Sequence, residues 1–218
     1  MPSEFAGVIF DLDGTLTDSA PGITACIAHA LARHGLAPAD PATLTRFVGP
    51  PLRESFAELA GGDPALVAGL IAAYRERFAG VGLFENTVYP DVAQLLAELR
   101  RAGLPLAVAT AKPGVYARRI LRHFDLAGAF CAVVGSHLDG RRSDKPALVG
   151  EALRRLRLPA ARVAVVGDRL QDVAGARAWG ATAIGVLWGY GGVEELTAAG
   201  ADHLCQTPLE LGRLLLPA

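Results

Sequence analysis

The sequence predicts an α/β protein, in which helices cover a parallel sheet and an all-helical segment is inserted after the first strand. Three observations support this fold class. From Tyr89 onward, short apolar stretches typical of buried strands alternate with longer stretches of helical periodicity. The apolar run over residues 8–10 lies far upstream of that alternation. Between Thr17 and Phe84 the pattern is helical, and no convincing strand interrupts it.

The expected elements follow in order along the chain. After the first strand, a helix is expected over residues 19–35. Ser19 can cap this helix, Pro21 suits its first turn, and Gly35 suits its end. Further helices are predicted over residues 41–47, 52–59 and 64–78. The second part of the chain alternates between strands over residues 104–110, 130–135, 162–167, 181–187 and near His203, and helices over residues 91–103, 113–124, 146–156, 171–180, 193–199 and 209–216.

This order of elements also predicts two domains. Apolar strands that alternate with helices indicate a parallel sheet covered on both faces. The first strand must join that sheet, because a lone strand is not stable. We therefore expect a core domain made of residues 1–16 and 86–218, and an inserted helical domain made of residues 17–85. The hinges between them are expected near Thr17 and over residues 84–89.

Composition narrows the possible partners and the location. The chain has 218 residues, 51% of them hydrophobic, and its 21 basic and 22 acidic residues leave a net charge of −1. This balance argues against a nucleic-acid polymer as partner, and no apolar stretch approaches the ~18–20 residues of a membrane span. The N-terminus lacks the pattern of a signal peptide. Cys26, Cys131 and Cys205 form no CxxC pair and suggest buried thiols in a reducing compartment. We expect a cytoplasmic monomer or homodimer.

Two carboxylates follow the first strand directly. Asp11 and Asp13 come after the apolar run and before a turn led by Gly14. Open α/β sheets hold their ligands at the carboxyl ends of their strands. A carboxylate pair at that position could bind a hard cation, attack an electrophile or move a proton.

Two later strands are followed by groups that could hold an anion. Thr110 ends its strand just before Lys112-Pro113, which is expected to start a helix, so its hydroxyl would lie near free amides and a positive dipole end. Lys145 stands at the start of the next helix, after Asp144. Each has a simpler explanation when taken alone: a helix-start residue for Thr110, a solvated cation for Lys145, and a turn or capping residue for Asp144.

A third strand end completes the set. Asp168 follows Gly167 at the end of an apolar strand, and Asp172 lies four residues later in the first turn of a predicted helix. Helix-dipole stabilisation explains Asp172 equally well. Together with Asp11 and Asp13, these carboxylates would form an oxygen-rich cluster suited to Mg²⁺. Phosphoryl transfer needs a nucleophile, an acid/base, a metal ion and groups that hold the phosphate.

This ordered set resembles the haloacid dehalogenase-like (HAD) phosphatase superfamily, in the branch that carries a helical cap. The four motifs correspond to Asp11-Leu12-Asp13-Gly14-Thr15, Thr110, Lys145, and Gly167-Asp168 with Asp172. The resemblance covers nearly the whole chain. It implies a Rossmann-like core with residues 17–85 as the cap, and a Mg²⁺-dependent phosphatase that acts on small organic phosphate monoesters.

The resemblance also implies a role for each matching residue. The catalytic set would be Asp11, Asp13, Thr110 and Lys145. Asp11 would attack phosphorus and form an aspartyl-phosphate, while Asp13 would protonate the leaving oxygen and then activate water. The metal set would be the side chains of Asp11 and Asp168 with the backbone carbonyl of Asp13. The phosphate set would be Thr110, Lys145 and Gly14, and Asp172 would orient Lys145 or a metal-bound water.

Alternative interpretations fit parts of this pattern. An EF-hand loop is excluded, because Leu16 and Gly22 stand where such a loop needs glycine and glutamate. The glycine-rich residues 189–192 match no nucleotide-binding motif and suggest a loop near the rim of the site. Within the superfamily, Asp13 argues against dehalogenases, which lack an acid/base there. A β-phosphoglucomutase-like isomerase remains an alternative, because such mutases keep this residue.

Substrate choice is expected to depend on the cap. Residues 47–53 look like the family's substrate-specificity loop, in which Arg53 could meet an anionic leaving group or could equally be a solvated first-turn residue. His137, in a loop after a predicted strand, could touch substrate. These loops look most like the branch of phosphoglycolate phosphatases and related 5′-nucleotidases. We therefore expect a phosphoglycolate phosphatase-like enzyme, with 5′-nucleotidase activity on nucleoside monophosphates as the alternative.

Overall fold

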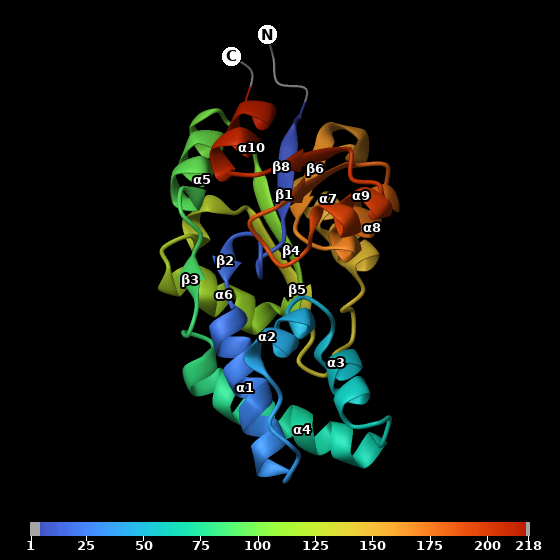
Figure 1. Ribbon diagram of the computed structural model, residues 1–218. Coiled ribbons are helices and arrows are strands. Elements are labelled where there is room, and N and C mark those ends of the chain that lie inside the picture. The colour runs from blue at the N-terminus through green and yellow to red at the C-terminus, as the bar shows by residue number, and fades with distance from the viewer. Residues whose placement is uncertain (1–4, 217–218) are drawn as a thin grey trace.

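A six-stranded parallel sheet forms the centre of the protein in the computed structural model, which describes residues 5–216 apart from the side chains of Pro41 and Ala42. Its strand order is β5-β4-β1-β6-β7-β8, and all neighbours run parallel (Figure 1). The strands are β1 (Gly7–Phe10), β4 (Leu106–Pro113), β5 (Ala132–Ser136), β6 (Val163–Gly167), β7 (Thr182–Val186) and β8 (His203–Cys205). The predicted α/β class is confirmed.

Helices cover both faces of this sheet, as the alternation of its side chains requires. Val8 and Phe10 on β1 face one apolar cluster, and Ile9 between them faces the other. The first face is covered by α5 (Val92–Arg101), α6 (Gly114–His123) and α10 (Pro208–Leu215). The second is covered by α7 (Lys145–Leu156), α8 (Leu170–Arg177) and α9 (Val193–Ala199). Short turns η3 (Ala127–Ala129) and η4 (Ala160–Arg162) lead into β5 and β6.

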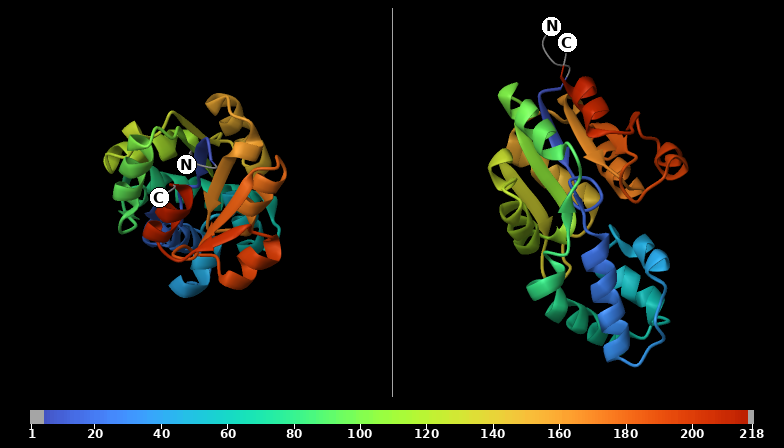
Figure 2. Two further views of the ribbon diagram at one scale, coloured as in Figure 1. Left: turned by 90° about the horizontal axis from the view of Figure 1, so that it is seen from above. Right: turned by 60° about the vertical axis from the view of Figure 1, so that its left-hand side comes forward.

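A helical region lies beyond the carboxyl ends of the strands (Figures 1 and 2). It contains α1 (Ala20–Arg33), α2 (Pro41–Leu44), η1 (Thr45–Phe47), α3 (Leu52–Leu59), α4 (Pro64–Arg77) and the π-helical turn η2 (Phe78–Gly82). The rings of Phe56, Tyr74 and Phe78 pack against one another within it. Its apolar side chains are continuous with the cluster on the first face of the sheet. The helical region is therefore packed against the sheet as well as linked to it.

A small antiparallel pair of strands joins the two parts. In β2 (Thr17–Asp18) and β3 (Thr87–Val88), Thr17 pairs with Val88 and Asp18 with Thr87. The expectation of no strand after Thr17 is wrong at this point, because a two-residue strand shows no periodicity in a sequence. The chain therefore leaves and re-enters the sheet region at neighbouring positions.

Three local predictions are also wrong. β4 runs to Pro113 with an irregular register after Thr110, so Thr110 does not end its strand, although α6 begins at Gly114, one residue from the predicted helix start. Ser19 stands at the N-cap of α1, but its side chain makes no capping hydrogen bond. Cys131 is exposed, whereas Cys26 and Cys205 are buried as expected. Across residues 5–216, no helix has the length and apolarity needed to cross a membrane.

Candidate active site

The end of β1 holds the first motif in a tight turn. Asp11 donates its backbone N–H to Val166 O of β6 at 2.9 Å, which keeps the turn in register with the neighbouring strand. Gly14 follows with φ +81°, and a Cβ at this position would lie 2.2 Å from Asp168 Oδ2. Only glycine fits both conditions. The first and fourth predicted motifs are therefore in direct contact.

Lys145 lies at the start of α7, which Asp144 caps by accepting a hydrogen bond from Ala147 N at 3.0 Å. The interpretation of Asp144 as a capping residue is confirmed. Lys145 Nζ contacts Asp172 Oδ1 at 2.7 Å and Asp11 Oδ2 at 3.0 Å, and donates to Ala109 O. Burial disfavours its charged form, but the two carboxylates outweigh burial and raise the pKa of Lys145. The ammonium therefore stays charged where a phosphate would need it.

Three buried carboxylates lie together beside this lysine. Asp11, Asp168 and Asp172 each offer an oxygen within 4.8 Å of the others. Burial raises the pKa of Asp168 to about 8, and the charges of Asp172 and Asp11 add to the shift. Burial also raises the pKa of Asp11 to about 6, although Lys145 opposes it. We call this group the acidic triad.

The acidic triad fits a divalent cation. Among the described residues, Asp11 Oδ1 is buried and has no hydrogen-bond partner. An oxygen of this kind is costly unless an ion or donor meets it, and carboxylate oxygens are the ligands that hard cations prefer. A bound cation would also offset the repulsion between carboxylates that adds to the effect of burial on the pKa values of Asp11 and Asp168.

Asp168 is held by donors on both of its oxygens. Thr15 Oγ1 donates to Oδ1 at 3.1 Å, and Tyr190 N donates to Oδ2 at 2.9 Å. Tyr190 belongs to the glycine-rich loop 189–192, which the sequence predicts at the rim of the site. This loop therefore forms part of the wall around the acidic triad.

Asp13 lies outside the acidic triad and has a partner of its own. Lys112 Nζ contacts Asp13 Oδ1 at 2.8 Å, and both side chains are buried. Lys112 Nζ also lies 4.8 Å from the centre of the Phe78 ring, at the end of the helical region. The sequence pattern predicts no role for Lys112, because it places this residue at a helix start. Simple alternation along a strand could not have revealed it, because the register of β4 becomes irregular after Thr110.

Thr110 is buried within β4, and its Oγ1 accepts a hydrogen bond from Lys112 N at 3.3 Å.

A cavity of about 410 Å³ opens between the helical region on one side and Asp13 and Lys112 on the other. Arg53 and His137 both line this cavity. Its apolar wall includes Ile23, Phe47, Ile71, Tyr74, Phe78 and Tyr116. A more open cavity of about 590 Å³ lies beside β5, α6 and α7 and contains no acidic-triad residue.

Comparisons with known proteins identify the family. The sequence model of the haloacid dehalogenase-like hydrolase family matches residues 5–180. A 5′-nucleotidase of Pseudomonas aeruginosa is 42% identical over 211 residues, which cover 97% of this chain and 96% of that protein. A phosphoglycolate phosphatase of Rhodospirillum rubrum is 35% identical over 84% of this chain and 80% of that protein. The crystal structure of a predicted phosphatase from Clostridium acetobutylicum superimposes with a TM-score of 0.92 at 42% identity, over 96% of this chain and 97% of that one.

The chain therefore belongs to the haloacid dehalogenase-like hydrolase family. Its predicted enzyme class, a phosphoric monoester hydrolase, is confirmed by the family match and by relatives that carry phosphatase names. The HAD fold predicted for the core is confirmed by the family match together with the structural match.

Proposed function

We propose that the protein is a Mg²⁺-dependent phosphatase that hydrolyses small organic phosphate monoesters through an aspartyl-phosphate on Asp11. The observation that carries this proposal is the position of Lys145, whose ammonium joins Asp11 and Asp172 inside a buried acidic triad. Such an arrangement provides a nucleophile and positive charge in one place. Phosphoryl transfer depends mainly on that combination.

The proposed roles follow from the contacts. An Asp11 oxygen attacks phosphorus, the ester P–O bond breaks, and the leaving oxygen takes a proton from Asp13. Asp13 then takes a proton from water, whose oxygen attacks phosphorus, so that phosphate leaves and Asp11 is restored. Lys145 and Thr110 hold the phosphate oxygens with the backbone around Gly14, and Asp172 keeps Lys145 in position.

Mg²⁺ would be held by the side chains of Asp11 and Asp168 and by the backbone carbonyl of Asp13. When bound, it would supply the positive charge that offsets repulsion between a carboxylate nucleophile and a phosphate dianion. The unpartnered Asp11 Oδ1 supports this part of the proposal. Mg²⁺ suits an all-oxygen site better than softer metals do.

We propose residues 17–85 as the cap, with the β2–β3 pair as its hinge. The cavity between the cap and Asp13 would admit the leaving group, and cap closure would exclude water from it. Small phosphate esters are the expected substrates. A cytoplasmic location, a monomer or homodimer, and the lack of nucleic-acid or membrane partners stay predictions.

The relative named phosphoglycolate phosphatase and the resemblance of the loops support a phosphoglycolate-like substrate. The cavity supports a second candidate. Its volume of about 410 Å³ exceeds what a two-carbon leaving group would fill. Its wall includes the aromatic side chains of Tyr74, Phe78 and Tyr116. A nucleoside would fill more of this volume and contact these apolar side chains, which favours the 5′-nucleotidase alternative.

A substrate panel tests the proposal. Purified protein is assayed for phosphate release from 2-phosphoglycolate, nucleoside 5′-monophosphates and sugar phosphates, with Mg²⁺ and with excess chelator. We expect phosphate release that needs Mg²⁺. Absence of Mg²⁺-dependent release from every ester would contradict the proposal. Interconversion of glucose phosphates that outruns phosphate release would instead favour the mutase alternative.

A further inference from the structure

Tyr190 connects the acidic triad to the start of the helical region. Its backbone N–H donates to Asp168 Oδ2 at 2.9 Å. Its hydroxyl donates to Asp18 Oδ1 at 2.8 Å and accepts hydrogen bonds from Ser19 N at 2.8 Å and Ala20 N at 2.9 Å. Ser19 and Ala20 begin α1. One residue therefore bonds to a proposed metal ligand and to the first turn of the proposed cap.

The loop that carries Tyr190 is packed closely against Asp168. A Cβ at Gly189 would lie 2.3 Å from Asp168 Cβ, and a Cβ at Gly191 would lie 1.9 Å from Asp168 O. Trp188, which precedes the loop, donates from Nε1 to Thr15 O at 3.0 Å and anchors it to the first motif. The loop is thus packed tightly around Asp168. These contacts provide a direct route from the position of Asp168 to that of Tyr190.

At the hinge that the Tyr190 hydroxyl contacts, several buried polar side-chain atoms lack a hydrogen-bond partner. Among the described residues, Thr17 Oγ1, Ser19 Oγ and both amide atoms of Asn86 are buried and have no hydrogen-bond partner. Each such atom destabilises the arrangement that leaves it unpaired, because it has lost its hydrogen bonds to water. These residues lie in or next to β2 and β3. A second hinge arrangement that pairs them would therefore compete with the present one.

We propose that Tyr190 is a positioning residue that couples cation binding at the acidic triad to the orientation of the cap at its hinge. This inference rests on the proposed Mg²⁺ site. A cation that fixes Asp168 fixes the loop and with it the Tyr190 hydroxyl, which holds the Ser19 and Ala20 amides. Coupling is reciprocal, so cap orientation must affect cation affinity by the same factor. A purely structural role would hold the hinge equally with and without the cation.

The Ser19 amide offers a direct readout. It donates to the Tyr190 hydroxyl at 2.8 Å, whereas the Ala20 amide divides its donation between that hydroxyl and Asp18 Oδ1 at 3.2 Å. Hydrogen exchange at Ser19 is measured by NMR in the full chain with and without Mg²⁺, and Mg²⁺ affinity by calorimetry. In the wild type we expect Mg²⁺ to slow exchange at Ser19 at least fivefold. In Tyr190→Phe we expect less than a twofold change, together with weaker Mg²⁺ binding.

A second variant and a control keep the test decisive. Asp18→Ala changes no residue of the loop and removes Oδ1, which accepts from the Tyr190 hydroxyl and from the Ala20 amide. This variant serves if Tyr190→Phe does not fold, and the protection at Ser19 should then fall by at least half. Trp179→Phe removes a comparable hydrogen bond, from Nε1 to Pro146 O, at an exposed position. It should keep the wild-type response to Mg²⁺.

The outcomes separate this inference from the proposed function. Wild-type protein that binds Mg²⁺ without slowing exchange at Ser19 contradicts the coupling alone. So does a Tyr190→Phe protein that binds Mg²⁺ and retains the wild-type protection. Wild-type protein that binds no Mg²⁺ contradicts the metal site of the proposed function, and the coupling with it.

Discussion

Lys112 Nζ contacts Asp13 Oδ1 at 2.8 Å, and both side chains are buried beneath the helical region. The proposed acid/base is therefore held by a cation that also lies over the ring of Phe78. This contact joins the chemistry of the core to the end of the proposed cap.

Removal of the Lys112 ammonium should affect both stability and turnover. Lys112→Met leaves Asp13 buried without its partner, which should lower the free energy of unfolding by about 3 kcal/mol. Turnover should fall about tenfold or more, because the acid/base loses its fixed position. Urea denaturation and kcat for p-nitrophenyl phosphate measure the two effects. Arg154→Gln, which breaks an exposed pair with Glu151, should cost less than about 1 kcal/mol; equal losses in both variants would refute the expectation.

Asp11 should be indispensable for turnover but not for folding. Asp11→Asn removes the proposed nucleophile while Lys145 keeps Asp172 as a partner. We expect kcat to fall about 10³-fold or more, with an unchanged circular dichroism spectrum. Asp125→Asn is the matched control, because Asp125 has φ +56°, which asparagine tolerates, and lies outside the site. Near-normal activity of Asp11→Asn would rule out the proposed mechanism.

The acidic triad should make stability depend on pH when no cation is bound. Asp168 and Asp11 have folded-state pKa values of about 8 and about 6, against 3.8 in the unfolded chain. At pH values between 3.8 and these folded-state pKa values, the folded state binds more protons than the unfolded state. The free energy of unfolding therefore falls as the pH rises. In chelator, the melting temperature should therefore be lower at pH 8 than at pH 5.5 by about 2 °C or more. Asp168→Asn should reduce this slope, and Mg²⁺ should raise the melting temperature at pH 8.

The contact between Gly14 and Asp168 should be intolerant of a side chain. Gly14→Ala forces a Cβ to within 2.2 Å of Asp168 Oδ2 at φ +81°. Gly35→Ala provides the control, because Gly35 has φ +65° and a Cβ added there would meet no atom within 4 Å. The control should cost about 1 kcal/mol from backbone strain alone. Gly14→Ala should cost about 2 kcal/mol more in chemical denaturation, and a similar cost in both would refute the close contact.

Much of the fold could be predicted because its signals are local. The run over Val8, Ile9 and Phe10 shows the composition of a buried strand, and β1 lies at the centre of the sheet between β4 and β6. Asp11 and Asp168 could be proposed as neighbours, because carboxyl ends of parallel strands share one edge of the sheet. Regular periodicity and strand polarity carry this information without knowledge of distant contacts.

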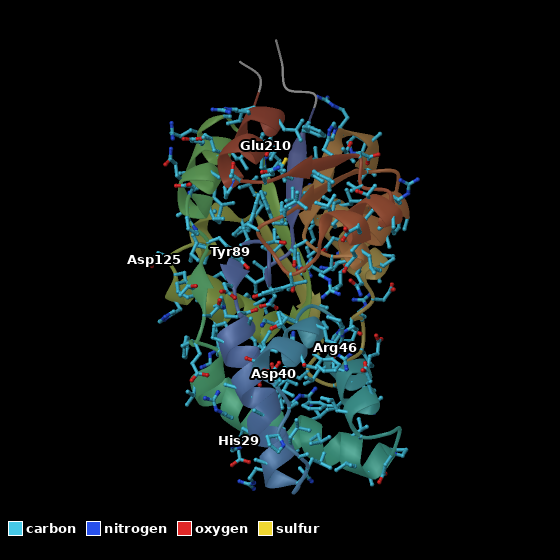
Figure 3. All side chains as sticks on the ribbon, viewed as in Figure 1. His29, Asp40, Arg46, Tyr89, Asp125 and Glu210 are labelled. Carbon is cyan, nitrogen blue, oxygen red and sulfur yellow. The ribbon has the colours of Figure 1, made fainter. Side chains whose placement is uncertain are left out.

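The features that escaped prediction depend on distant contacts or on very short elements. Thr17 pairs with Val88, although the whole helical region separates them in the sequence. No pattern in a two-residue strand reveals that pairing. Ser19 has a typical capping side chain, yet the donor groups of α1 are met by the hydroxyl of Tyr190 from the far end of the chain. The local sequence thus predicted the start of α1 correctly, but it did not reveal which group accepts hydrogen bonds from the first amides of this helix. Tyr89, which directly follows β3, lies at this junction between the sheet and the helical region (Figure 3).

The pairing of β2 with β3 has a consequence for how such a protein can diversify. Because Thr17 and Val88 are adjacent, the chain departs from the sheet and returns to it at almost the same point. Everything between them can be lengthened, shortened or exchanged without a break in the order of the six parallel strands. The proposed reacting groups stay at the strand ends, while the exchanged piece changes its own part of the cavity wall. Two residues of antiparallel pairing thus make the proposed cap a replaceable module.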